Sequence, residues 1–168
     1  AITSTISGEG KTFVAINLGG VMAFSGKRVI VLDLDMRKPK IHVGFGVNND
    51  KGVSTILIGK DVPENCIHKS NLENLDFITA GPIPPNPAEL IISPKMDKLI
   101  ETLKKDYDVI IIDTPPVGIV TEGIPLIQRA DYPIYVGRSH DAKKAGINNV
   151  ITLSTDNHIS RISIVLNG

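Results

Sequence analysis

"ITSTISGEGKT", residues 2–12, is the stretch that points most directly to a fold. It ends in Gly-Lys-Thr, as does the phosphate-binding loop G-x-x-x-x-G-K-[ST], but Thr5 stands where that pattern has its first glycine. Residues 1–4 are typical of the end of a strand, and residues 12–26 have the apolar spacing of a helix. Gly8 and Gly10 let the backbone turn its N–H groups inward. The N-terminus of the following helix points at the same place, and a helix N-terminus favours binding of an anion. The stretch therefore predicts a loop that holds nucleotide phosphates, with Lys11 reaching the β- and γ-phosphates and Thr12 ligating Mg²⁺.

The rest of the chain alternates apolar runs with longer amphipathic segments. The runs are apolar on both faces, as strands covered on both sides must be: "RVIVLDLD" (28–35), "LDFITA" (75–80), "YDVIIIDT" (107–114), "YPIYV" (132–136) and "RISIVLN" (161–167). Helical patterns lie at 12–26, 93–106, 121–130 and 143–154, whereas 38–60, with a short apolar turn at "VSTILIG", and the proline-rich 81–87 fit neither element. This alternation predicts an α/β fold with a mostly parallel sheet flanked by helices on both faces. The phosphate-binding loop at its start adds the expectation of the P-loop NTPase type.

Aspartates end two of the predicted strands. Asp33 and Asp35 are two residues apart, so they face the same way at the end of 28–35, and Asp113 ends the run 107–114. In open α/β sheets ligands bind outside the carboxyl ends of the strands. Close carboxylates repel one another unless a metal or a cation such as Arg37 holds them, and an aspartate after an apolar strand is typical of a Walker B magnesium ligand. We therefore expect Lys11, Thr12 and the three aspartates to meet at one edge.

Length and composition favour one ordinary globular unit. The chain has 168 residues, 42% of them hydrophobic, and we expect a single ATP-binding domain over 1–168, cut at both ends from a longer protein. Basic and acidic residues balance at 18 each, which argues against a broad nucleic-acid-binding surface. The single cysteine, Cys66, rules out an intrachain disulfide and favours a reducing compartment, and no apolar run is long enough to span a membrane.

Several of these stretches resemble the cytoplasmic catalytic domain of the bacterial tyrosine kinases (BY-kinases) of polysaccharide export. "SGEGKT" resembles their Walker A motif, with Ser7 in place of the usual proline, "VLDLDMRKP" their Walker A′ motif and "DVIIIDTPP" their Walker B motif. "GVSTILIG" and "AGPIPPNPAELI" resemble two further family segments. The resemblance covers residues 1–138 well and the rest loosely. The wider class is the deviant-Walker P-loop ATPases, which include the partitioning and septum-site ATPases.

The resemblance implies a role for each matching residue. Nucleotide contacts are expected from the loop and from two late residues, namely Ser7, Gly8, Glu9, Gly10, Lys11, Thr12, Arg138 and Asn167. Lys11, Asp33 and Asp35 would be catalytic, and Asp33 is either the base toward a tyrosine hydroxyl or an orienting carboxylate; which aspartate is the base stays open. Mg²⁺ would be held by Thr12, Asp35 and Asp113, partly through water. Arg138 is expected near the phosphates and Asn167 near the adenine, with structural roles as the alternatives.

By the same resemblance, the chain is expected to be an ATP-dependent, autophosphorylating protein-tyrosine kinase domain that regulates capsular or exopolysaccharide biosynthesis and export. Its substrates would be tyrosines of its own C-terminal tail or of a neighbouring subunit in a homo-oligomer. A membrane co-polymerase would activate it at the cytoplasmic face of the bacterial membrane, through an anchor outside this chain. Tyr107, Tyr132 and Tyr135 lie at or in predicted strands, so we expect them in the core. The alternatives are a deviant-Walker ATPase that positions partners by ATP-driven dimerisation, and a nucleotide-binding regulatory module with little turnover.

Overall fold

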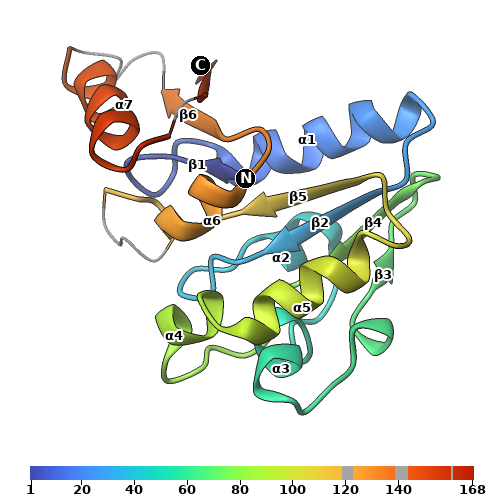
Figure 1. The fold of residues 1–168 in the computed structure, drawn as a ribbon. Coiled ribbons are helices and arrows are strands. Elements are labelled where there is room, and N and C mark those ends of the chain that lie inside the picture. The colour runs from blue at the N-terminus through green and yellow to red at the C-terminus, as the bar shows by residue number, and fades with distance from the viewer. Residues whose placement is uncertain (119–122, 139–143, 160) are drawn as a thin grey trace.

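A seven-stranded sheet, ordered β3-β4-β2-β5-β1-β6-β7, forms the centre of the molecule (Figure 1). The computed structural model describes residues 1–118, 123–138, 144–159 and 161–168. The strands are β1 (Ile2–Thr3), β2 (Val29–Asp33), β3 (His68–Lys69), β4 (Leu75–Ile78), β5 (Val109–Asp113), β6 (Ile134–Arg138) and β7 (Ser163–Asn167). Neighbouring strands pair in parallel, except that β3 runs antiparallel to β4 at one edge. The predicted α/β fold with a mostly parallel sheet is confirmed.

Helices cover both faces of this sheet. They are α1 (Lys11–Phe24), α2 (Ile41–Phe45), α3 (Val53–Ile58), α4 (Pro87–Ile91), α5 (Pro94–Leu103), α6 (Ile124–Arg129) and α7 (Lys144–Asp156), with a 3-10 turn at Pro63–Asn65. Successive side chains of β2 enter opposite cores, because a strand presents alternate residues to each face. Ile30 and Leu32 pack in the cluster that includes residues of α3 and α5, whereas Val29 and Val31 pack in the cluster that includes α1 and α2.

Small residues let α1 lie close against the sheet. Ala15, Gly19 and Ala23 recur every four residues and are buried, which is the spacing of one helix face. A Cβ added at Gly19 would meet side-chain atoms of Val31 and Leu75 at 3.1 Å, so a larger residue there would push the helix outward. The close packing fixes the start of α1, and with it Lys11 and Thr12, relative to the ends of β2 and β5.

The register of the central strands brings their carboxyl ends together. Asp33 of β2 lies opposite Asp113 of β5, and Ile2 of β1 also pairs with Asp113. The arrowheads of β2 and β5 point to the side of the molecule where the loop between β1 and α1 lies (Figure 1). Parallel strands thus deliver the two aspartates and the loop to one edge of the sheet.

Two predictions about local structure were wrong: residues 38–60 were expected to form neither helix nor strand but contain α2 and α3, and Tyr132 was expected in the core. "VSTILIG" forms helix α3, because Val53 and Ser54 donate their N–H groups to the carbonyls of Thr79 and Ala80 and so start the helix on the end of β4. Tyr132 is not in the core, since 79% of its surface is exposed; Tyr135 is buried and Tyr107 is half-buried. The short edge strand β3 has too few residues to show a strand pattern in sequence.

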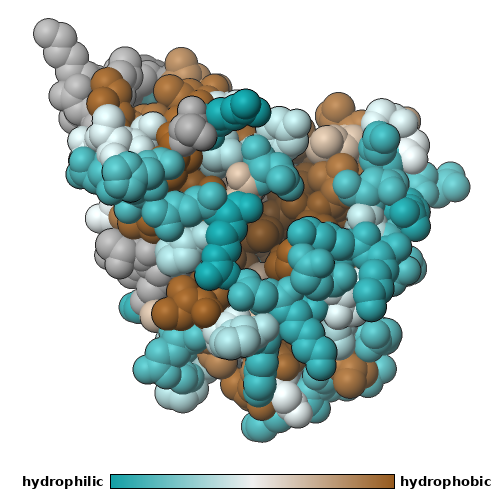
Figure 2. Space-filling model, in the orientation of Figure 1, coloured by the Kyte–Doolittle hydropathy of each residue, from teal (hydrophilic) through white to brown (hydrophobic). Residues whose placement is uncertain are grey.

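The surface in Figure 2 shows apolar residues gathered in a hollow over the middle of the molecule, with hydrophilic residues around it. Three apolar residues of β5, Val109, Ile110 and Ile112, are only half-buried. Within the described ranges, no helix is both long and apolar enough to cross a membrane.

Candidate functional site

Two glycines set the path of the loop between β1 and α1. Gly8 and Gly10 have φ angles of 93° and 94°, a left-handed conformation that residues with a Cβ rarely adopt. Gly10 directly precedes α1, so the free N–H groups of the first helical turn follow at once on the loop. Backbone N–H groups gathered at a helix N-terminus form a site suited to phosphate.

Contacts within the protein brace this loop from behind. The buried carboxylate of Glu9 accepts the N–H of Ile6 at 2.8 Å, and the Asn167 side chain donates to the Glu9 carbonyl at 3.2 Å. Thr5, at the position of the missing glycine, contacts the Tyr135 hydroxyl through its own hydroxyl. Thr5 therefore links the loop to β6, a contact that glycine could not make.

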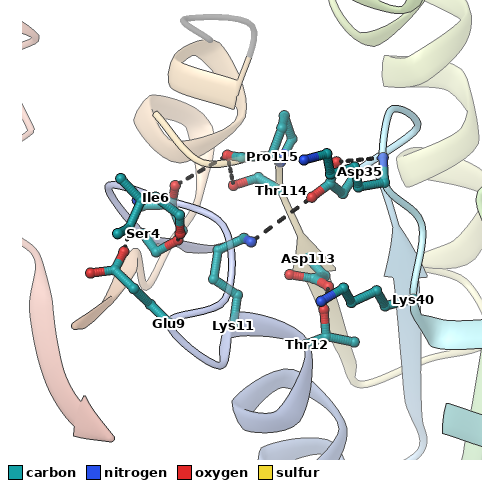
Figure 3. A network of polar contacts seen from close by, with 12 residues as sticks. Ser4, Ile6, Glu9, Lys11, Thr12, Asp35, Lys40, Asp113, Thr114 and Pro115 are labelled. Atoms are coloured by element: carbon teal, nitrogen blue, oxygen red, sulfur yellow. Dashed lines mark hydrogen bonds and ion pairs between the residues drawn. The ribbon is translucent and has the colours of Figure 1, made fainter. Parts of the chain in front are cut away.

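Three elements bring reactive side chains to the front of the loop (Figure 3). The ammonium of Lys11, from α1, lies 3.9 Å from Oδ2 of Asp35, which follows β2. The Thr12 hydroxyl donates to Oδ2 of Asp113 at 2.5 Å. Lys11, Asp35 and Asp113 are all buried, with 5%, 7% and 0% of their surface exposed. Charges that are this buried interact strongly with one another and with any ligand that reaches them.

Asp33, the last residue of β2, holds the loop that leaves this strand. Its Oδ2 accepts the N–H groups of Lys40 and Ile41, both at 3.0 Å, and its Oδ1 accepts the N–H of Asp35 at 3.2 Å. Asp33 has no exposed surface. Both of its carboxylate oxygens are therefore engaged with the protein's own backbone.

Burial raises the pKa of all three carboxyls. The pKa of Asp33 rises to about 7, first because of burial and then because of the neighbouring charge of Asp113. The pKa of Asp113 rises to about 6 through burial, opposed by the charge of Lys11 and the hydrogen bond from Thr12. Burial also raises the pKa of Asp35, again opposed by Lys11. Ionising these buried carboxyls therefore costs free energy, and a bound cation would offset that cost.

The donor set fits Mg²⁺ bound together with a nucleotide. Oδ1 of Asp113 is buried and has no hydrogen-bond partner in the part of the chain that the structure describes. Mg²⁺ is usually bound through one or two carboxylates plus phosphates and water, and not by an all-protein cage. In keeping with this, the described residues contain no cluster of three or more His, Cys, Asp or Glu side chains that could hold a metal. Thr12 and Asp113 could hold the ion, with Asp35 close by.

The remaining predicted residues lie around the loop. Ser7 is half-buried in it, and Asn167 is engaged with Glu9, so its contact with an adenine stays a prediction. Arg138 is exposed at the end of β6, beside Asn167 in the register of β6 and β7. Sequence reasoning missed Lys40, whose ammonium is directed toward Thr12 and Asp113 in Figure 3. The only available signal was its place shortly after the aspartate pair.

Comparison with known proteins agrees with these features. A family model described as an AAA domain matches residues 1–161. The tyrosine-protein kinase YwqD of Bacillus subtilis is 41% identical over 143 residues, which cover 85% of this chain and 60% of YwqD. The solved kinase domain of VpsO is 34% identical, superposes with a TM-score of 0.92, and is matched over 99% of this chain and 82% of its own length. The chain belongs to the bacterial tyrosine kinase family.

This BY-kinase chain corresponds to part of its longer relatives. It covers 60% of YwqD, and only 17% of the tyrosine-protein kinase wzc of Salmonella typhi, to which it is 42% identical over 121 residues, 72% of this chain. The septum-site-determining protein MinD of Pyrococcus horikoshii, solved with Mg-ADP, is 22% identical with a TM-score of 0.78 and is matched over 97% of this chain and 65% of its own. That likeness shows a shared P-loop fold.

Proposed function

We propose that this chain is the catalytic domain of an ATP-dependent protein-tyrosine kinase. The observation that carries the proposal is the meeting of Lys11, Thr12, Asp35 and Asp113 in front of a glycine-rich loop. A phosphoryl group is transferred mainly by positioning and charge neutralisation, so a site of this kind needs few covalently acting groups. Family membership supports protein tyrosine as the acceptor, because the YwqD and wzc relatives are named tyrosine-protein kinases.

The residues would divide the work as follows. The amides from Gly8 to Thr12 and the Lys11 ammonium bind the triphosphate, while Thr12 and Asp113, with Asp35, hold Mg²⁺. When bound, Mg²⁺ neutralises phosphate charge and orients the β- and γ-oxygens. Of the two roles open for Asp33, we propose the orienting one, because both of its oxygens accept backbone N–H groups. Arg138 and Asn167 remain candidates for the nucleotide's outer contacts.

The proposed reaction breaks the bond between the γ-phosphorus and the oxygen that bridges to the β-phosphate. A bond forms between that phosphorus and the phenolic oxygen of a tyrosine, whose proton leaves to a carboxylate or to water, and ADP departs. The Lys11 side chain would offset the charge on the phosphate oxygens.

The biological setting is proposed from the family. We infer a role in controlling capsular or exopolysaccharide biosynthesis and export. The acceptors would be tyrosines of the kinase itself or of a neighbouring subunit in a homo-oligomer. A membrane co-polymerase or activator would be the partner, with the kinase at the cytoplasmic face of the membrane.

The test is phosphotyrosine formation. The whole protein that carries this chain is incubated with Mg²⁺ and γ-labelled ATP, and labelled phosphotyrosine is measured over time. We expect Lys11→Ala to lower the rate by on the order of 100-fold, as the loss of one preorganised charge-stabilising group does in other enzymes. Lys60→Ala, at an exposed lysine beyond α3, is the matched control and should leave the rate unchanged.

The same assay tests the alternative function, that of a deviant-Walker ATPase. The fold shared with MinD supports this alternative. That function predicts free phosphate, ATP-dependent dimerisation and no phosphotyrosine. Release of free phosphate that depends on Lys11, without labelled tyrosine in any subunit, would overturn the kinase proposal.

A further inference from the structure

A second lysine faces the site from the side opposite the phosphate loop. Lys40 lies on the loop between β2 and α2, and its backbone is held in place because its N–H is donated to Asp33 at 3.0 Å. Lys40 is an exposed residue, so a ligand could reach it from solvent. In Figure 3 this side chain extends toward Thr12 and Asp113, while Lys11 reaches toward Asp35.

The charge of Lys40 reaches both carboxyls at the front of the site. It acts to lower the pKa of Asp35 and also that of Asp113. Lys38, two residues earlier on the same loop, also acts through its charge to lower the pKa of Asp35. Both lysines of this loop therefore place positive charge near Asp35, and Lys40 also does so near Asp113.

A bound triphosphate would add negative charge to a site that already contains three aspartates. Lys11 and one Mg²⁺ together only offset the three carboxylates Asp33, Asp35 and Asp113 when these are ionised. The triphosphate then brings further negative charge, and phosphoryl transfer proceeds through a state that places charge on the γ-oxygens. A flexible ammonium at the rim is suited to this task, because lysine contacts phosphate as a point charge and needs no fixed geometry.

We propose that Lys40 is a second phosphate-binding lysine, which contacts the γ-phosphate of the bound nucleotide from the side opposite Lys11. The inference rests on the proposed nucleotide-binding function. It assigns the γ-phosphate because Lys40 is directed at Thr12 and Asp113, the pair that would hold Mg²⁺ beside the terminal phosphates. Lys40 would thereby favour ATP over ADP.

Binding of nucleotides tests this without any turnover. Affinities for ATP, in the form of a slowly hydrolysed analogue, and for ADP are measured by calorimetry in Mg²⁺ for wild type, Lys40→Met, Lys40→Arg and Lys38→Met. We expect Lys40→Met to weaken ATP-analogue binding by about tenfold, an effect of about 1.4 kcal/mol, with ADP binding nearly unchanged. Lys40→Arg should restore the preference, and Lys38→Met should keep the wild-type ratio.

Each result is decisive. If Lys40→Met weakens both nucleotides equally, or neither, then Lys40 does not contact the γ-phosphate and the inference is wrong while nucleotide binding stands. If Lys38→Met lowers the ratio as much as Lys40→Met does, the effect belongs to the general charge of the loop, and the inference is again overturned. If the wild-type chain binds neither nucleotide, the proposed function fails as well.

Discussion

The two ends of strand β5 carry aspartates in opposite physical states. Asp108, just before the strand, accepts the backbone N–H of Arg28 at 2.9 Å and its guanidinium at 2.8 Å. Asp113, the last residue of the strand, is fully buried, and its Oδ1 has no hydrogen-bond partner among the described residues. The hydrogen bonds from Arg28 lower the pKa of Asp108 to about 2, whereas burial raises that of Asp113 to about 6. One carboxylate is satisfied by the protein, and the other is available to a ligand.

Burial alone does not make this difference. Asp76, at the same edge of the sheet as Asp108, is also buried, but its Oδ2 accepts both the Tyr107 hydroxyl and the Lys69 ammonium at 2.6 Å. The contrast indicates that a functional carboxylate can be recognised by a buried oxygen without a hydrogen-bond partner. Such an unpaired atom destabilises the folded chain, and a bound ligand can offset that cost.

The largest expected difference between the two ends of β5 is in nucleotide affinity. Asp113→Asn should weaken Mg²⁺-nucleotide binding by on the order of 100-fold, because a carboxylate next to the proposed metal becomes neutral. Asp108→Asn, at the other end of the strand, should leave the affinity unchanged. Calorimetric titration of both variants with Mg-ADP measures the difference. Equal affinities would count against Asp113 as a magnesium ligand.

The pH dependence of stability should also distinguish Asp113 from Asp108. The raised pKa values of Asp33 and Asp113 mean that the folded, ligand-free chain binds more protons than the unfolded chain between about pH 4 and 7. The free energy of unfolding attributable to these groups therefore falls as the pH rises through that window. Asp113→Asn removes one such group, so we expect it to raise the free energy of unfolding at pH 7 by on the order of 2 kcal/mol.

Urea unfolding of the ligand-free protein at pH 5 and at pH 8 measures this effect. The gain for Asp113→Asn over wild type should be larger at pH 8, where the wild-type carboxyl is ionised. Asp108→Asn serves as the control and should show no such gain. A variant that is less stable than wild type at pH 8 would mean that the charge of Asp113 is already compensated by the protein.

Much of the site's location could be predicted from sequence, because it follows from strand direction. Asp33 and Asp113 end apolar runs, and the carboxyl ends of parallel strands meet at one edge, so these two residues had to lie near Lys11 once the sheet was parallel. The glycines in the loop likewise indicated that the backbone there has positive φ angles. These features depend on short-range pattern and on a general rule of topology.

What could not be predicted depends on contacts between distant segments. The helix at α3 starts because its N–H groups meet carbonyls at the end of β4, and Gly52 is required because a Cβ there would lie 2.1 Å from the Thr79 carbonyl oxygen. The engagement of Asp33 with three N–H groups requires the path of the loop up to Ile41. The direction of Lys40 depends on that same path, and no local propensity specifies it.

A smaller effect is expected where the protein satisfies its own carboxylate. Tyr107→Phe removes one of two donors to Asp76 and should lower the free energy of unfolding by about 1 kcal/mol, the usual net value of one hydrogen bond. Tyr132→Phe, at a tyrosine that is 79% exposed, is the matched control and should change nothing. Chemical denaturation at pH 7 compares the two. The nucleotide affinity of both should equal that of wild type; a loss in Tyr107→Phe would show that the two edges of the sheet are coupled.

The smallest effect belongs to the exposed pair of Arg28 and Asp108. Arg28→Met keeps the backbone N–H and much of the alkyl chain but removes the guanidinium, and exposed ion pairs add little to stability. Because the pKa of Asp108 is lowered in the folded state, any contribution is present above the unfolded value of 3.8 and is lost as the pH falls toward about 2. The difference between Arg28→Met and wild type should therefore be slight at pH 7, smaller in 1 M salt and also smaller at pH 2, where Asp108 is partly protonated. Denaturation under these three conditions measures it. A difference that persists in 1 M salt would show that Arg28 stabilises the fold through packing. The contrast between Asp108 and Asp113 would then not be explained by ion pairing and hydrogen bonding alone.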